Sequence, residues 1–279
     1  MKIEKAIIPV AGWGTRRLPI TKVIEKAMLP IGNRPLVDYV VRDCVAAGIK
    51  DIYIVIDEKP FSQVKAFYSE NKNLSQYLIA RGKSDRLALA DTNYPGVKLH
   101  FFPQKDVDKH YGSAAPVAQV VKAFSIKEPT AVLMGDDFSY NKDGSSDLAA
   151  LTELIESPSD SAMLATRIDP AETEKYGVLK VEDGRLTGIY EKPKREDAPS
   201  NLINISKYIM SAELLARVTD YCHKHDFGPK DQEYVITDPI LAHIKDGGVI
   251  KVMPIKGQYL DGGSLSGWLE ANRVIFAEA

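Results

Sequence analysis

A run of glycines and basic side chains near the N-terminus has the composition of a phosphate-binding loop. It spans residues 9–35, follows the apolar run 6–8 and contains Gly12 and Gly14. Glycine lets a backbone approach a ligand closely, and exposed N–H groups beside fixed positive charge bind phosphate oxygens. The positive charges of this loop are Arg16, Arg17, Lys22, Lys26 and Arg34. We expect the loop to bind a small polyanion, although Arg17 and Lys22 could equally be ordinary solvated charges.

A carboxylate suited to a divalent cation lies further along the chain. Asp136 follows the apolar run 130–134, separated from it only by Gly135. A side chain just past the carboxyl end of a buried parallel strand lies where α/β sheets bind their ligands. Oxygen ligands of this kind hold Mg²⁺ together with phosphate groups. We therefore expect Asp136 to hold a cation between phosphates, with Asp137 either supporting it or being simply part of the loop.

Strands alternating with helices must position these residues in the first half of the chain. Buried strands are indicated by the apolar runs 6–8, 51–57, 97–103 and 130–134, and helices by the patterns at 35–47 and 113–123. This alternation predicts βαβ units, and hence an α/β fold with a Rossmann-like, mostly parallel central sheet flanked by helices. Residues 61–91 are helical and polar in pattern, and we expect them outside the sheet.

The second half of the chain has a different pattern. Short apolar runs separated by turn signals such as E-D-G-R predict antiparallel or mixed strands added to the same sheet. The later elements are expected as a strand at 202–210, helices at 211–221 and 237–245, a strand at 249–255 and a terminal helix at 264–276 capped by Ser264. We expect a single domain over residues 1–279, with halves at about 1–140 and 141–279.

Composition and missing motifs exclude several classes of function. Lys and Arg total 36 against 38 for Asp and Glu, so the chain lacks the bulk positive charge of a nucleic-acid-binding surface. The two cysteines, Cys44 and Cys222, suggest neither a disulfide framework nor a metal site. Without a signal peptide or a long apolar span, the expected location is cytoplasmic, with no membrane partner. Gly-Lys-Ser occurs at 82–84, but Tyr77 stands where the motif G-x-x-x-x-G-K-[ST] needs its first glycine, so that phosphate-binding motif is absent. Arg17 replaces the third glycine of the dinucleotide fingerprint.

Three motifs resemble those of the sugar-phosphate nucleotidyltransferases. The run G-W-G-T-R-R-L-P-I-T-K, followed by E-K-A-M-L-P, is similar to their signature loop and closest to that of the bacterial UTP–glucose-1-phosphate uridylyltransferases. Tyr176-Gly177-Val178 and Glu191-Lys192-Pro193 resemble two further family motifs, and A-P-S-N at 198–201 follows the second as it does in the uridylyltransferases. The match covers nearly the whole chain.

The resemblance implies Mg²⁺-dependent transfer from UTP to glucose 1-phosphate, giving UDP-glucose and pyrophosphate. Both reactants are anionic, so such a catalyst supplies positive charge, a cation and alignment, without a covalent nucleophile. The resemblance assigns the catalytic cations to Arg16, Lys26 and Lys192, the nucleotide contacts to Ala11, Gly12, Gly14, Gln104 and Gly112, the sugar contacts to Gly177, Glu191 and Lys192, and the metal ligands to Asp136 and Asp261. It also implies a homodimer or homotetramer.

The sequence departs from the uridylyltransferase pattern in two places. The usual P-K-E-M-L-P is E-K-A-M-L-P here, with Glu25 and Ala27 on either side of the lysine. After Gln104, Gly112 is kept but Ser113 stands where the family has His. Alternatives therefore stay open: another nucleotide such as dTTP, another hexose 1-phosphate, or a module that binds nucleotide sugars without turnover.

Overall fold

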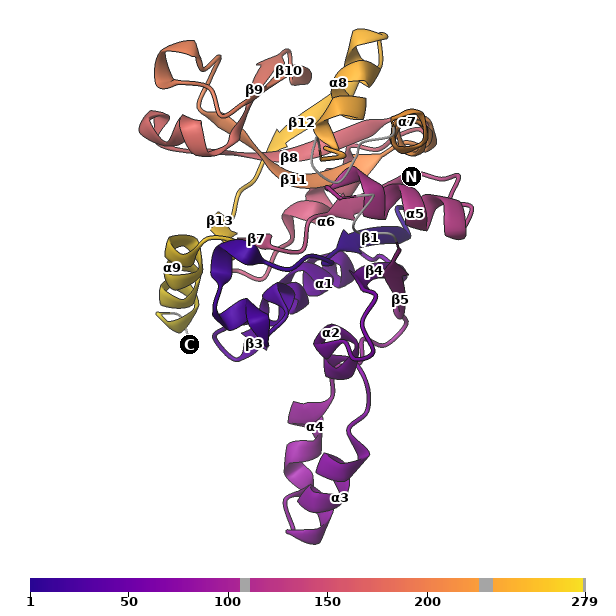
Figure 1. The fold of residues 1–279 in the computed structure, drawn as a ribbon, viewed down its shortest axis with the longest axis vertical. Coiled ribbons are helices and arrows are strands. Elements are labelled where there is room, and N and C mark those ends of the chain that lie inside the picture. Colours follow the sequence, from indigo (N-terminus) through magenta and orange to yellow (C-terminus); the bar gives the residue numbers. More distant parts are fainter. Residues whose placement is uncertain (106–110, 226–232, 278–279) are drawn as a thin grey trace.

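A mixed β-sheet runs through the protein, as the alternation of strands and helices predicts (Figure 1). The computed structural model describes residues 1–105, 111–225 and 233–277. Within these residues the sheet has nine strands, in the order β5-β4-β1-β6-β11-β8-β12-β10-β9. Their bounds are β1 Lys5–Pro9, β4 Asp51–Asp57, β5 Lys98–Gln104, β6 Thr130–Leu133, β8 Ser161–Arg167, β9 Gly177–Glu182, β10 Arg185–Glu191, β11 Leu202–Met210 and β12 Ile250–Pro254.

The strands of the first half are parallel, and those of the second half make the sheet mixed. β1 pairs in parallel with β4 and β6, and β4 with β5. β11 then pairs antiparallel with both β6 and β8, which joins the two halves in one sheet. Helices cover both faces of these parallel strands. Because side chains on both faces are therefore buried, the runs in β1, β4 and β6 are continuously apolar.

Helices pack on both faces of the sheet and form two hydrophobic cores with it. One core contains α1 (Leu36–Ala46) and α6 (Asp147–Glu153), and the other contains α5 (Ala114–Ala123), α7 (Ala212–Lys224) and α8 (Thr237–Lys245). In α1 the predicted apolar face is buried, including Cys44, whose thiol is a packing group. None of the described helices is long and apolar enough to cross a membrane.

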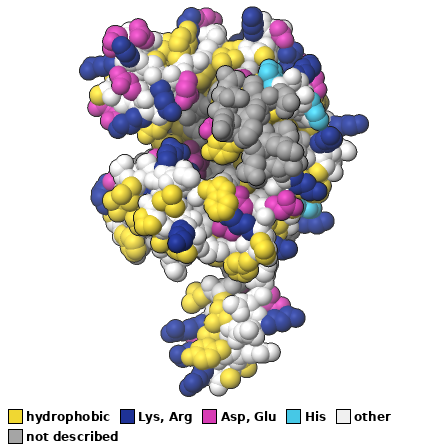
Figure 2. Space-filling model, viewed as in Figure 1, with side chains coloured by type: hydrophobic (Ala, Val, Ile, Leu, Met, Phe, Trp, Pro, Cys, Tyr) yellow, Lys and Arg dark blue, Asp and Glu magenta, His cyan; other side chains and the backbone are white. Residues whose placement is uncertain are grey.

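Residues 61–91 project from the body as an arm, which confirms that they lie outside the sheet (Figure 1). The arm contains α2 (Gln63–Phe67), α3 (Lys72–Ala80), the short 3-10 helix η4 (Ser84–Arg86) and α4 (Leu87–Ala90). Its base is anchored in the core through Val64 of α2 and the neighbouring Tyr68, both of which are buried. Figure 2 shows the rest as a separate projection whose surface mixes hydrophobic and basic side chains.

Short elements beside the sheet bring the C-terminal part of the chain back to the first loop. β7 (Asp137–Tyr140) pairs antiparallel with β13 (Gln258–Asp261), and this register sets Asp137 opposite Asp261. A hairpin of β2 (Pro30–Ile31) and β3 (Arg34–Pro35) ends the first loop. Helix α9 (Leu265–Phe276) follows β13. The Ser264 side chain accepts a hydrogen bond from Gly267 N, as expected for the cap of this helix. Two further 3-10 helices, η5 (Pro170–Lys175) and η6 (Arg195–Asp197), flank β9 and β10.

Candidate active site

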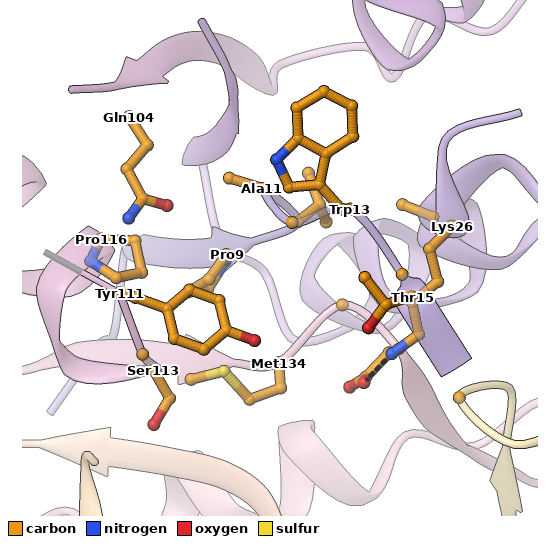
Figure 3. A pocket seen from close by; sticks show the side chains of 18 of the residues that line it. Pro9, Ala11, Trp13, Thr15, Lys26, Gln104, Tyr111, Ser113, Pro116 and Met134 are labelled. Carbon is orange, nitrogen blue, oxygen red and sulfur yellow. Dashed lines mark hydrogen bonds and ion pairs between the residues drawn. The ribbon is translucent and has the colours of Figure 1, made fainter. Parts of the chain in front are cut away.

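A cavity of about 520 Å³ lies between the first loop, the end of β5, the start of α5 and the turn after β6 (Figure 3). The predicted residues that line it are Ala11, Gly12, Gly14, Arg16, Lys26, Gln104, Gly112 and Asp136. The structure therefore brings the expected phosphate loop, the expected nucleotide contacts and one expected metal ligand together around one space.

The first loop approaches this cavity as three consecutive 3-10 turns. They are η1 (Thr15–Arg17), η2 (Ile20–Lys22) and η3 (Lys26–Met28). Gly14 begins the series with φ +59°, and a β-carbon there would lie 3.0 Å from Lys26 Cβ. Glycine is therefore needed for the left-handed backbone and for the close packing of the Lys26 segment. Thr21 Oγ1 donates to Gly14 O over 2.9 Å, which holds the first and second turns together.

Lys26 and Asp136 form an ion pair at the edge of the cavity, drawn as a dashed line in Figure 3. Lys26 Nζ lies 2.5 Å from Asp136 Oδ2. Burial of Asp136 favours its neutral form, but the charges of Lys26, Lys207 and Arg16 outweigh burial and lower the pKa of this carboxyl below its ordinary value. Asp136 is therefore ionised at neutral pH and presents an acceptor to a cation.

A buried network that the sequence analysis did not find lies beneath Asp136. Lys207 Nζ donates to Asp137 Oδ1 and, over 2.8 Å, to Met134 O. Tyr259 Oη donates to Asp137 Oδ2 over 3.0 Å. Asp137 is thus buried and bound on both oxygens, so of the two roles expected for it, it has that of supporting the Asp136 turn. Lys207 lies in a plain apolar strand pattern, and the sequence gives no signal that its side chain turns inward.

Asp261 lies next to this pair and binds Ser264, the residue that caps α9. Its Oδ1 accepts from Gly263 N over 2.7 Å, and its Oδ2 accepts from Ser264 Oγ over 2.6 Å. A β-carbon added at Gly263 would lie 3.0 Å from Asp261 Oδ1. The same atom would lie 3.3 Å from both Asp136 Oδ2 and Lys26 Nζ. The two predicted metal carboxylates and Lys26 therefore converge on the small volume that Gly263 leaves open.

The far end of the cavity holds the expected nucleotide contacts. Gln104 is buried at the end of β5, and its amide lines the space (Figure 3). Gly112 has φ +121°, and a β-carbon there would lie 2.5 Å from Tyr234 N, so no other residue fits without a shift of the backbone. Ser113, at the position of the family histidine, accepts a hydrogen bond from Ile236 N over 3.0 Å and so joins α5 to the segment before α8.

The expected sugar contacts form a second cluster, which does not line this cavity. A β-carbon on Gly177 would lie 3.2 Å from Glu191 Oε2, and Lys192 Nζ lies 3.5 Å from Glu191 Oε1. Lys192 N donates to Tyr176 O, and the Tyr176 ring contacts that of Tyr259, which in turn donates to the carboxylate beneath Asp136. The cluster is exposed and adjoins the carboxylates through Tyr176.

Arg17 and Trp13 of the first loop lie in positions that the sequence alone does not predict. Arg17 is buried: its Nη1 donates to Ser264 O over 2.7 Å, and its guanidinium stacks on Trp268. It therefore fixes α9 to the loop, and it also lines the cavity beside Arg16. Trp13 is 63% exposed and stands over the cavity with Lys59 Nζ 4.4 Å from its ring (Figure 3).

A glycine-bearing loop, two cations and two carboxylates thus meet at one edge of an α/β sheet, an arrangement of charges suited to phosphate groups. Sequence comparison is more specific. The chain belongs to the nucleotidyl transferase family, whose model matches residues 5–278.

Individual relatives match over nearly the same length. UTP–glucose-1-phosphate uridylyltransferase 1 of Staphylococcus saprophyticus is 32% identical, over 97% of this chain and 91% of the relative. The solved structure of a UTP-bound UGPase from Acinetobacter baumannii superposes with a TM-score of 0.87 at 27% identity, covering 99% of this chain and 94% of that one. A UDP-glucose pyrophosphorylase complexed with UDP-glucose gives a TM-score of 0.78 at 29% identity, covering 99% and 100%.

Proposed function

We propose that the protein catalyses the Mg²⁺-dependent reaction of UTP with glucose 1-phosphate to give UDP-glucose and pyrophosphate. The observation that carries the proposal is the convergence of Arg16, Lys26 and Asp136 on one cavity that also holds Gln104. The uridylyltransferase relatives and the neighbours with UTP and UDP-glucose support the choice of substrates.

The chain's own residues align and neutralise the two anionic reactants. Arg16 binds the β- and γ-phosphates of the nucleotide, and Lys26 binds phosphate oxygens near the α-phosphorus. The phosphate oxygen of the sugar attacks the α-phosphorus, the bond to the β-phosphate oxygen breaks and pyrophosphate leaves. Gln104 hydrogen-bonds the uracil edge, and the backbone of Ala11 and Gly12 lies along the nucleotide. Lysine and arginine charges in a partly dry cavity stabilise the transition state more than the separated substrates.

Asp136 and Asp261 are the residues that would hold Mg²⁺. Both are oxygen donors, and the lowered pKa of Asp136 keeps that carboxylate ionised. Two carboxylates would leave the other coordination positions of the ion to phosphate oxygens and water. When bound, the ion would neutralise charge between the phosphates.

The exposed cluster at the ends of β9 and β10 would bind the hexose phosphate. Glu191 accepts hydrogen bonds from sugar hydroxyls, Lys192 binds the sugar's phosphate, and the backbone at Gly177 contacts the ring. Because this cluster adjoins the carboxylates through Tyr176, a bound sugar phosphate would lie beside the metal-binding residues.

The experiment that tests the substrates is pyrophosphate release from purified protein with Mg²⁺ and glucose 1-phosphate. UTP, dTTP, CTP, ATP and GTP are offered separately, and we expect release with UTP well above the others. Preference for another nucleotide would support nucleotidyl transfer but show that the residues around Gln104 do not select uracil. If no nucleotide is turned over with any hexose 1-phosphate, the protein is a binding module and the proposal fails.

Two substitutions test the proposed roles. We expect Lys26→Ala and Asp136→Asn each to lower kcat by about 10²–10³-fold, since each removes one charge contact to the transition state. Lys22→Ala is the matched control, because Lys22 belongs to the same loop, is exposed and does not line the cavity. Near-wild-type turnover in either test variant would contradict the assignment.

The expectations of a homo-oligomer and of a cytoplasmic location also remain proposals. A second copy would contact the arm, where Tyr77, Ile79 and Leu89 are exposed apolar side chains. Light scattering on the wild-type protein and on Leu89→Asp measures the oligomeric state. A wild-type monomer, or a variant with an unchanged oligomer, would remove the arm from consideration.

A further inference from the structure

Glu25, the residue before Lys26, binds the first turn of the arm. Its carboxylate accepts hydrogen bonds from Gln63 N over 3.1 Å, from Val64 N over 3.2 Å and from Ser62 Oγ over 3.3 Å. Helix-start N–H groups have no partner within their own helix, so a carboxylate that accepts from them is well satisfied. Glu25 thus supplies from the first loop the acceptors that the start of α2 requires.

Gln63 completes this contact from the opposite side. Its Oε1 accepts from Glu25 N over 2.8 Å, and its Nε2 donates to Val23 O over 2.9 Å. The two segments are therefore joined by reciprocal hydrogen bonds that involve both backbones and both side chains. Since the adjacent Val64 is fully buried in the core, this contact ties the Lys26 segment to a fixed point of the core.

We infer that Glu25 and Gln63 form a clamp that positions Lys26 for the proposed reaction; the inference rests on that proposed function. The loop around Lys26 consists of short 3-10 turns, whose hydrogen bonds constrain a chain weakly. The uridylyltransferase-like motif has proline at position 25, and Glu25 adopts φ −57°, which lies in the range that the proline ring enforces. Here hydrogen bonds to α2 hold the backbone conformation that a ring holds covalently in that motif.

The clamp makes a residue of the arm matter for catalysis although it does not line the cavity. Gln63 is half-buried and lies outside the cavity wall. Loss of its side chain frees the Glu25 amide and the Val23 carbonyl, which lets the Lys26 segment move. A displacement of about 1 Å at a charge that aligns a phosphate reduces turnover by about 10- to 100-fold. We expect Gln63→Ala to lower kcat by this factor with little change in melting temperature.

A double-mutant cycle separates positioning from a merely structural role. Turnover is measured for wild type, Gln63→Ala, Lys26→Ala and the double variant, with Glu70→Ala, at an exposed glutamate of the arm, as the control. If Gln63 acts through Lys26, its substitution lowers kcat in the wild-type background and has no further effect once Lys26 is alanine. A wild-type rate for Gln63→Ala, or an equal loss in both backgrounds, would overturn the inference.

Substitutions at Glu25 give a rescue test. Glu25→Ala should lose activity as Gln63→Ala does, whereas Glu25→Pro restores the fixed φ and should keep turnover within about twofold of wild type. In the Glu25→Pro background, Gln63→Ala should then have no effect. If proline behaves like alanine, backbone restriction is not what the clamp provides.

Hydrogen exchange supplies a readout that does not depend on turnover. Amides of residues 24–29 should exchange faster in Glu25→Ala and Gln63→Ala than in wild type. In Glu70→Ala their exchange rates should equal those of wild type. Unchanged exchange in the two clamp variants would disprove the clamp. Faster exchange in the two clamp variants, together with no pyrophosphate release by the wild-type protein from any substrate pair, would instead retain the clamp and refute the proposed function.

Discussion

Removing the buried cation beneath the carboxylates should destabilise the protein strongly. The side chains of Lys207 and Asp137 are only 3% and 11% exposed, and they form an ion pair. Lys207→Met leaves the Asp137 carboxylate buried with the Tyr259 hydroxyl as its remaining donor. Breaking one partner of a buried pair costs about 3–5 kcal/mol of the free energy of unfolding. Because the Tyr259 hydrogen bond survives, we expect a loss near the lower end, about 3 kcal/mol.

The loss should depend on pH in a definite direction. Burial raises the pKa of Asp137 to about 6, although the charge of Lys207 opposes this shift. The folded protein therefore holds this proton more tightly than the unfolded chain does. The resulting stabilisation is fully present below the ordinary carboxyl pKa near about 4 and is lost as pH rises through about 6. Without Lys207 the pKa rises further, so the deficit should be smaller at about pH 5 than at about pH 7.5.

Urea unfolding of wild type, Lys207→Met, Asp137→Asn and the double variant at both pH values measures these effects. The double variant should lose less than the sum of the single losses, since it leaves neither charge unpaired. Lys180→Met, which removes an exposed pair with Glu182, is the control and should change stability by less than about 1 kcal/mol. A Lys207→Met deficit below about 1 kcal/mol, or one equal at both pH values, would refute the reasoning.

Other substitutions test separate parts of the site. Gly112→Ala should lower both the melting temperature and the UTP affinity, because its β-carbon would collide with the Tyr234 backbone. Gly96 also has a positive φ but open space around it, so Gly96→Ala, the control, should lower the free energy of unfolding by only about 1 kcal/mol. Equal effects of the two substitutions would exclude the collision. Lys192→Ala should raise KM for glucose 1-phosphate and leave UTP affinity, measured by calorimetry, within about twofold; a selective loss of UTP affinity would contradict this. UTP should change the fluorescence of the exposed Trp13, and Trp13→Phe should abolish that signal; an unchanged signal would place the nucleotide elsewhere.

The strands of the sheet could be predicted because each is indicated by the apolar pattern of its own short segment. Continuous apolar runs such as 51–57 and 130–134 became β4 and β6 with almost unchanged bounds. The long terminal helix and its cap could also be predicted, since Ser264 precedes an amphipathic pattern. What stayed out of reach was the projection of the arm from the body, because a polar helical pattern does not reveal whether neighbouring helices return to the sheet.

The buried Lys207 network could not be predicted for a different reason. Its side chain turns inward because β11 is irregular: Ser206 has φ +53°, and the pairing with β8 shifts between Asn204 and Tyr208. Such an irregularity depends on two strands far apart in the chain. The run Arg16-Arg17 poses the same problem at close range: both arginines line the cavity, but composition cannot decide which of the two also binds α9.

The ion pair between Lys26 and Asp136 explains why the loop needs a rigid attachment. Lys26 and Asp136 lie 2.5 Å apart, so in the proposed reaction phosphate oxygens would compete with this carboxylate for Lys26. A flexible loop would let Lys26 follow Asp136 and keep the pair closed. When Glu25 and Gln63 fix the backbone on α2, only the lysine side chain has to reorient, and less freedom is lost on binding. A clamp at residue 25 therefore favours the exchange of partners that nucleotidyl transfer at this cavity requires.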